Sequence, residues 1–208
     1  MIFFHLFEIQ NKELLVGLAN KKQIDMKRTV LTVALFSLTM ITSANAQNTM
    51  VGGEAMLPAQ NIVENAINSE DHTTLVAAVK AGDLVEALQG EGPLTVFAPV
   101  NDAFENLPEG TVETLLKEEN KEMLQGVLTY HVVSGKYDFD ALKKMISKGG
   151  GSAELTTLSG GTLTATMNGS HNIMIEDENG GVANISVYDV YQSNGVIHVV
   201  DSVLLPEM

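Results

Sequence analysis

Apolar positions in the first half of the chain recur every three or four residues, the spacing that places them on one face of a helix. The segment 61–68 begins with Asn61, a preferred helix N-cap. Farther along, 73–92 predicts two short helices that end at Gly82 and Gly90, because glycine accepts the left-handed conformation at a helix C-terminus. The apolar positions of the first helix are Ile62, Val63, Ala66 and Ile67.

Helical spacing continues over 107–129 and returns over 138–146, where Asp138 or Asp140 is a suitable cap. Between these stretches, the letters YHVV at 130–133 are bulky and β-branched and predict a short strand. The longer stretch has two apolar faces, one formed by Val112, Leu115 and Leu116 and the other by Met123, Leu124, Val127 and Leu128.

Beyond the glycines at 149–151 the pattern changes to alternating polar and apolar residues separated by turns. Asn-Gly between alternating runs is a strong hairpin signal, because both residues tolerate positive φ. Helices followed by antiparallel strands predict an α+β protein with helices packed on the sheet. The turns are Asn168-Gly169, Asn179-Gly180-Gly181 and Asn194-Gly195.

The sequence TVFAPVNDAF, residues 95–104, changes from an apolar strand to a helix within a few residues. We expect a core strand over Thr95–Ala98, with Pro99 as its end and Asn101 or Asp102 as the cap of the next helix. The rings expected to be buried on either side of the bend are those of Phe97 and Phe104.

The N-terminal part of the chain has the pattern of an export signal. Residues 26–46 contain a basic start, an apolar run of about 13 residues and small residues before a cleavage site near Ala46. The run is shorter than the roughly 20 residues that cross a bilayer, so no membrane span is expected in the mature chain. Residues 1–25 are interpreted as a spurious upstream extension. The remainder is expected to divide into a linker, 47–57, and a single domain, 58–207.

Composition and motifs exclude several classes of chemistry. The chain has no cysteine, and therefore no disulfide, thiolate nucleophile or cysteine-ligated metal. After Ala46 it has seven lysines, no arginine and 23 acidic residues, a formal charge of −16 that makes nucleic acid an unsuitable partner. No GxSxG, HExxH, P-loop or dinucleotide-binding glycine pattern is present, and the histidines lack metal-ligand spacing. We therefore expect a non-catalytic protein without a metal or cofactor.

Three segments together resemble the fasciclin-type (FAS1) domain family: TVFAPVNDAF, then YHVV, then NGVIHVVDSVLLP at 194–206. The resemblance implies a wedge-shaped antiparallel β-sandwich packed with several short α-helices. It also implies a secreted or periplasmic adhesion module, expected as a monomer that binds an extracellular, envelope or surface protein or glycan. In receptor-binding members the tyrosine-histidine region is implicated in adhesion, and here it corresponds to Tyr130 and His131.

The tyrosine-histidine pair also has a structural interpretation. Alternation along a strand would point Tyr130 and His131 to opposite faces, which does not favour one shared contact patch. In this interpretation His131 is a neutral core histidine, hydrogen-bonded to Asn101 or Asp102, and Tyr130 packs beside the first motif.

The strand after Asn194-Gly195 is apolar on both faces, which is typical of a central strand covered on each side. We therefore expect His198 to be buried and hydrogen-bonded and Asp201 to order a turn.

A second hypothesis for the function is a small-molecule carrier. It requires an apolar pocket of several hundred cubic ångströms between the helices and the sheet. A solid core with an exposed apolar patch would favour the adhesion module instead.

Overall fold

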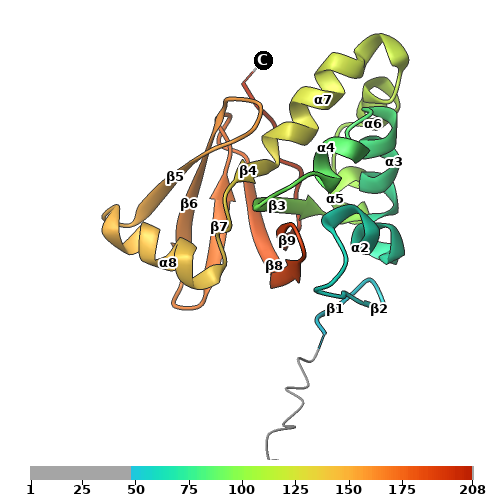
Figure 1. The fold of residues 1–208 in the computed structure, drawn as a ribbon. Coiled ribbons are helices and arrows are strands. Elements are labelled where there is room, and N and C mark those ends of the chain that lie inside the picture. The colour runs from blue at the N-terminus through green and yellow to red at the C-terminus, as the bar shows by residue number, and fades with distance from the viewer. Residues whose placement is uncertain (1–47, 208) are drawn as a thin grey trace, which may run out of the picture. The chain divides into compact units, whose positions relative to one another are not determined.

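The structure is a computed structural model that describes residues 48–207 (Figure 1). The expected signal peptide, 26–46, and the expected upstream extension, 1–25, lie outside the described residues. The linker and domain boundaries, by contrast, can be compared with the fold.

The segment expected to be a linker, 47–57, contains a small hairpin instead. In it, β1 (Met50–Val51) pairs with β2 (Glu54–Ala55). The side chains of Val51 and Met56 are buried among the core residues. The folded unit therefore includes this hairpin, which the small and polar composition of the segment did not indicate.

The predicted helical segments form, although 107–129 is divided into two separate helices. Two helices of the fold have an N-cap residue whose own side chain bonds to the first turn. The Asn61 side chain accepts a hydrogen bond from the Glu64 amide, and the Glu64 carboxylate accepts one from the Asn61 amide, a reciprocal capping box. Asp138 caps the last helix by accepting from the Ala141 amide. The helices are α2 (Ile62–Asn68), α3 (Thr73–Ala81), α4 (Val85–Gln89), α5 (Asn101–Glu105), α6 (Thr111–Leu115), α7 (Lys121–Tyr130) and α8 (Phe139–Lys148).

Seven strands form one sheet in the order β4-β3-β9-β8-β7-β6-β5. All neighbouring strands are antiparallel except β3 and β9, which are parallel. The two ends of this order meet, because Val133 bridges Thr157 and the Leu158 amide donates to the Val132 carbonyl at 2.7 Å. The strands are β3 (Leu94–Pro99), β4 (Val132–Ser134), β5 (Ser152–Thr156), β6 (Thr162–Asn168), β7 (Asn172–Glu176), β8 (Val182–Gln192) and β9 (Gly195–Val200).

The curled sheet and its helices confirm the predicted α+β sandwich, while the parallel pair was not predicted. All six residues of β9 are buried, as the apolar pattern on both faces predicted. Gly195 is required where β9 meets β3, because a Cβ atom at this position would lie 2.1 Å from the Leu94 carbonyl oxygen. Figure 1 shows α2 to α7 on one side of β3 and α8 on the other side, beside β5 and β6.

Two clusters of buried side chains result. The helical core lies between the helices and one face of β3 and β9, and it includes Ile62, Val63, Leu75, Val79, Leu128 and Ile197. The sheet core fills the inside of the curled sheet under α8, and it includes Phe97, Tyr130, Leu142, Leu163, Ile175 and Leu204.

The strand predicted from YHVV begins two residues later than expected. Tyr130 is the last residue of α7, His131 follows as its C-cap, and only Val132 starts β4. The prediction followed the β-branched residues and missed that Leu124, Val127 and Leu128 continue with His131 at helical spacing. The His131 side chain bonds to the Val127 carbonyl one turn earlier, which also ties it to the helix.

Candidate functional site

Tyr130 is a fully buried connector inside the sheet core. Its hydroxyl donates to the Thr162 carbonyl at 2.8 Å and accepts from the Glu178 amide at 3.1 Å. It therefore joins the start of β6 to the turn after β7. Burial raises the pKa of Tyr130, so the hydroxyl keeps the proton that it donates.

His131 holds the C-terminal segment against α7. One ring nitrogen, Nδ1, lies 2.8 Å from the Val127 carbonyl, and the other, Nε2, accepts from the Leu204 amide at 3.0 Å. These two bonds require a neutral ring protonated at Nδ1. Burial lowers the pKa of His131 to about 4. The neutral core histidine is as expected, but the partners expected for it, Asn101 and Asp102, were wrong.

Asn101 caps a different helix from the expected one. Its side-chain oxygen accepts from the Thr74 amide at 3.0 Å, and its nitrogen donates to the Glu70 carbonyl at 2.8 Å. It thus satisfies a free amide at the start of α3. The N-cap of α5 is Val100, whose side chain cannot form a hydrogen bond to the amides of the first turn. The Asp102 side chain is exposed.

The remaining residues of the first motif lie where the sequence placed them. Phe97 lies in the sheet core, and Phe104 packs against the helical core, so their rings are on opposite sides of the bend. The Thr95 hydroxyl donates to the Gly135 carbonyl at 2.7 Å and accepts from the Tyr137 amide at 2.9 Å. Pro99 is the last residue of β3.

The C-terminal motif residues are connectors as well. His198 is buried, its Nε2 lies 2.8 Å from the Tyr137 carbonyl, and its ring stacks on Phe97 with centroids 5.8 Å apart. Burial lowers the pKa of His198. Asp201 accepts from the Asn184 amide at 2.8 Å, a bond from the end of β9 to β8 in place of the expected turn.

Asn194 connects the β8–β9 hairpin to the helices. Its side-chain oxygen accepts from the Ile62 amide at 3.0 Å, and its nitrogen donates to the carbonyls of Leu88, at 2.8 Å, and Gly90, at 3.1 Å. The expected Asn-Gly turn is present, but neither Asn194 nor Gly195 has a positive φ. Asn194 is therefore needed for the hydrogen bonds of its side chain and not for its backbone conformation.

Tyr130 and His131 come together with the other motif residues in the interior. Each is less than 5% exposed, so neither presents a side chain on the folded surface. A direct role of this pair in binding stays a prediction.

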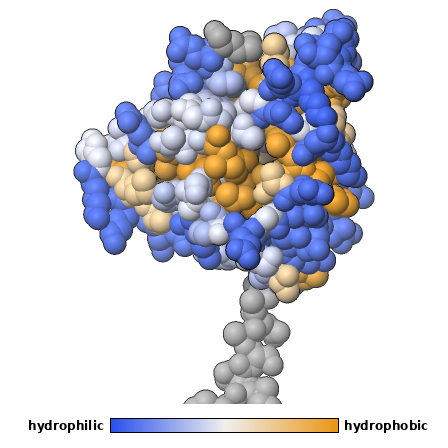
Figure 2. All heavy atoms as spheres, turned by 45° about the horizontal axis from the view of Figure 1, so that its top comes forward, coloured by the Kyte–Doolittle hydropathy of each residue, from blue (hydrophilic) through white to orange (hydrophobic). Residues whose placement is uncertain are grey.

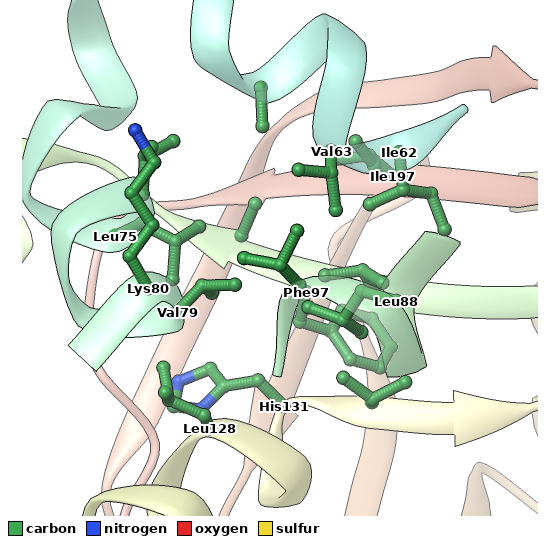
Figure 3. Close-up of a pocket in the computed structure, with 16 residues that line it drawn as sticks. Ile62, Val63, Leu75, Val79, Lys80, Leu88, Phe97, Leu128, His131 and Ile197 are labelled. Atoms are coloured by element: carbon green, nitrogen blue, oxygen red, sulfur yellow. The ribbon is translucent and has the colours of Figure 1, made fainter. Parts of the chain in front are cut away.

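An apolar pocket lies between α2, α3, α4 and the sheet, where the carrier hypothesis places it (Figure 3). Val63, Leu75, Phe97 and His131 are on its walls, and the Lys80 ammonium points away from it. Its free volume is about 40 Å³. Pockets for drug-sized ligands have about 300–1,000 Å³, so this pocket is too small for such a ligand.

Seven exposed acids and two lysines, Lys117 and Lys121, lie on α5 to α7 and the segments between them, and we call this the acidic helical surface. Leu116 and Met123 on it are 38% and 46% exposed, although helical spacing had assigned Met123 to a buried face. A surface hollow of about 260 Å³ is lined by residues of α5, α6 and the loop between them, such as Phe104 and Val112. The exposed acids are Asp102, Glu105, Glu109, Glu113, Glu118, Glu119 and Glu122.

Apolar side chains also reach the surface elsewhere. On the face shown in Figure 2, hydrophobic residues form a continuous area that is bordered by hydrophilic residues.

Residues 48–207 contain no group of three side chains suited to bind a metal ion. Among these residues, too, no helix has the length and hydropathy of a membrane span.

The fold and these connectors define a class: a helix-covered, mostly antiparallel sheet stabilised by buried polar side chains. The Fasciclin domain model matches residues 70–206, and the chain belongs to that family. The chain is 46% identical over 181 residues to protein sll1483 of Synechocystis, covering 83% of this chain and 92% of that protein. Human periostin is 30% identical over 146 residues, which is 70% of this chain and 16% of periostin.

A solved structure supports the same assignment of the fold. The FAS1 domain pair of the insect cell adhesion molecule Fasciclin I superposes with a TM-score of 0.61 at 20% identity. The match covers 70% of this chain and 51% of that one. The fold expected from the three sequence segments is thus confirmed.

Proposed function

We propose that this chain is a non-catalytic FAS1 binding module, exported to the periplasm or the cell exterior, that attaches to a surface macromolecule through the acidic helical surface. Membership in a family that includes a cell adhesion molecule supports a binding role. Export is proposed from the leader pattern in residues 26–46.

The observation that carries the proposal is the combination of exposed apolar residues and acids on α5 to α7. Leu116 and Met123 offer apolar area in a surface where seven carboxylates face water. Apolar residues inside a charged rim are the usual composition of a protein interface. The surrounding negative charge favours a cationic partner and accelerates its approach.

The buried histidines support the non-catalytic part of the proposal. His131 and His198 make hydrogen bonds to backbone groups, and burial lowers the pKa of both. His72 is also buried and bonded to the Ser69 hydroxyl at 2.8 Å. Each of these rings therefore has a structural hydrogen bond in the folded protein.

The test is capture of partners from a surface extract by the protein recovered from cells that express the full chain. We expect the double variant Leu116→Asp, Met123→Asp to lose capture, because it removes the apolar area and adds like charge. The matched control is Leu158→Asp on the sheet side, where the leucine is 49% exposed. Capture by wild type should weaken as salt is raised, because exposed charges are screened.

Two results would contradict the proposal: no capture by wild type, or equal loss in the Leu158→Asp control. Thermal melting of each variant establishes that the fold is retained.

A further inference from the structure

A second hollow lies at the N-terminal ends of β3 and β9, where three loops meet. It is lined by the α4–β3 loop (89–93), the β8–β9 hairpin (192–195) and Lys136, which follows β4. Its volume is about 530 Å³. This lies within the roughly 300–1,000 Å³ of small-molecule sites, and it is much larger than the apolar pocket.

The walls of this hollow are fixed by hydrogen bonds. Asn194 binds the Gly90 carbonyl at 3.1 Å and its own backbone carbonyl accepts from the Leu94 amide at 3.0 Å. The Ser193 amide donates to the Gln60 carbonyl at 2.8 Å, and the Gly135 amide donates to the Pro93 carbonyl at 2.8 Å. Loops held in this way need little ordering when a ligand binds, which favours affinity.

Several polar groups of the hollow remain available. Within residues 48–207, the amides of Glu91 and Gly92 donate no hydrogen bond, and the Ser193 hydroxyl makes none. Lys136 is exposed, and its ammonium lies 4.4 Å from the centre of the Tyr191 ring, which holds it at the rim. The unbonded donors of Glu91, Gly92 and Ser193, together with the Lys136 ammonium, therefore belong to residues that line the hollow.

The charge of the hollow selects among ligands. Its two ionisable side chains, Glu91 and Lys136, carry opposite charge and leave the lining close to neutral. A strong anion would be repelled by the Glu91 carboxylate, and a strong cation would be repelled by the Lys136 ammonium. A neutral ligand rich in hydroxyl groups can donate to one and accept from the other.

We propose that this hollow binds a neutral saccharide of one or two rings, as part of the surface macromolecule that the module recognises. The inference deepens the proposed function and rests on it for the source of the sugar, but the binding itself is measurable alone. A sugar chain on a glycoprotein and an envelope polysaccharide supply the same chemistry.

The direct test is an NMR titration of ¹⁵N-labelled protein, recovered from cells expressing the full chain, with cellobiose, maltose and N,N′-diacetylchitobiose. We expect at least one of these sugars, at up to about 50 mM, to shift the amide signals of Glu91 and Gly92, consistent with a Kd of roughly 1–10 mM. The absence of shifts in 89–93 and 192–195 with all three sugars would overturn the proposal, and so would shifts confined to other residues.

Matched variants locate the site. Lys136→Met should weaken the binding at least tenfold, whereas Lys148→Met, at another exposed lysine on α8, should leave it unchanged. Ser193→Tyr should abolish binding by filling the hollow. All three residues are exposed, so each variant should keep its stability within about 0.5 kcal/mol. Equal weakening by Lys136→Met and Lys148→Met would contradict a site in this hollow.

The capture assay separates this inference from the proposed function. Periodate, which cleaves vicinal diols, should remove capture from a treated extract, and enzymatic release of protein-linked glycans distinguishes glycoprotein from polysaccharide. If sugars shift the hollow while the Leu116→Asp, Met123→Asp variant still captures, the proposed surface fails and the hollow stands. If capture behaves as proposed but no sugar shifts the hollow, the saccharide site fails alone.

Discussion

The helical core and the sheet core differ in how completely they are closed. Many side chains of the sheet core have no exposed area, among them Leu163, Ile173 and Ile175. The helical core has residues such as Leu75 and Leu88 at 9% exposure and encloses the small apolar pocket. One core is sealed by a sheet that curls back on itself, and the other by short helices that cover it in pieces.

This difference shows where the fold is most constrained. The sheet core is sealed at its ends by side-chain bonds, such as those from the Tyr130 hydroxyl to β6 and the turn after β7. The helices are held at their ends, by caps such as Asn101 at α3 and by the side chain of Asn194. Truncations in the sheet core should therefore cost more than the same truncations in the helical core.

The largest effect is expected from a buried leucine in each core. Leu163→Ala should lower the free energy of unfolding by about 4 kcal/mol, and Leu75→Ala by about 2–3 kcal/mol. Leu163 is packed on all sides, whereas Leu75 already borders the pocket and loses fewer neighbours. Urea denaturation measures both, and an equal or larger loss for Leu75→Ala would break the comparison.

Acid should destabilise the fold at His131, which lies at the boundary between the two cores. The pKa of His131 is about 4 in the folded state against an ordinary 6.5, so the unfolded chain binds the proton first. The neutral ring makes its full contribution to the free energy of unfolding above about pH 6.5. This contribution falls by about 3 kcal/mol as the pH drops through 4. His72 and His198, whose pKa values are also lowered by burial, act in the same direction.

Urea midpoints measured across this pH range test the titration of His131. His131→Gln is expected to have a flatter dependence on pH, while the control His171→Gln, at an exposed histidine, should follow wild type. An unchanged slope in His131→Gln would refute the assignment.

A smaller effect isolates the bonds of the tyrosine hydroxyl. Tyr130→Phe keeps the ring but leaves the Thr162 carbonyl and the Glu178 amide without their partner, and it should cost about 1–2 kcal/mol. Tyr191→Phe, at 39% exposure, is the control and should cost about 0.5 kcal/mol or less. Equal melting temperatures for the two variants would show that the hydroxyl does not close the sheet core.

The smallest effect distinguishes the two neighbours at the start of α5. Asn101→Ala should cost about 1 kcal/mol through the lost cap of α3. Asp102→Ala removes only an exposed carboxylate and should cost about 0.5 kcal/mol or less. Thermal unfolding compares the stability of the two variants. A larger loss of stability for Asp102→Ala would support the sequence-based prediction that this residue caps α5.

Local signals predicted most of the elements. The N-cap at Asn61, the end of β3 at Pro99 and the hairpin turn at Gly180 each depend on residues close together in the chain. The family resemblance added the sandwich. What failed depends on distant partners: Asn101 resembles a cap for the helix that follows it, and only the folded chain brings Thr74 to its side chain.

The candidate surfaces were less predictable than the elements. Helical spacing placed Met123 with Leu124, but the short helices leave its side chain uncovered. The hollow proposed to bind a saccharide is formed by loops far apart in the sequence, and the Asn194-Gly195 motif in one of them predicted a hairpin but not a binding site. No pattern along the chain reports which polar groups stay free after folding.

The position of β9 has a consequence for biogenesis. This strand is the last in the domain, yet it lies between β3 and β8 in the middle of the sheet. A ribosome or an export channel releases it after every other strand of the domain, so β3 and β8 have no common neighbour until the whole domain has emerged. Chaperones that shield strand edges on the emerging polypeptide would therefore act until β9 is released, and premature termination before Gly195 would leave both edges open to aggregation.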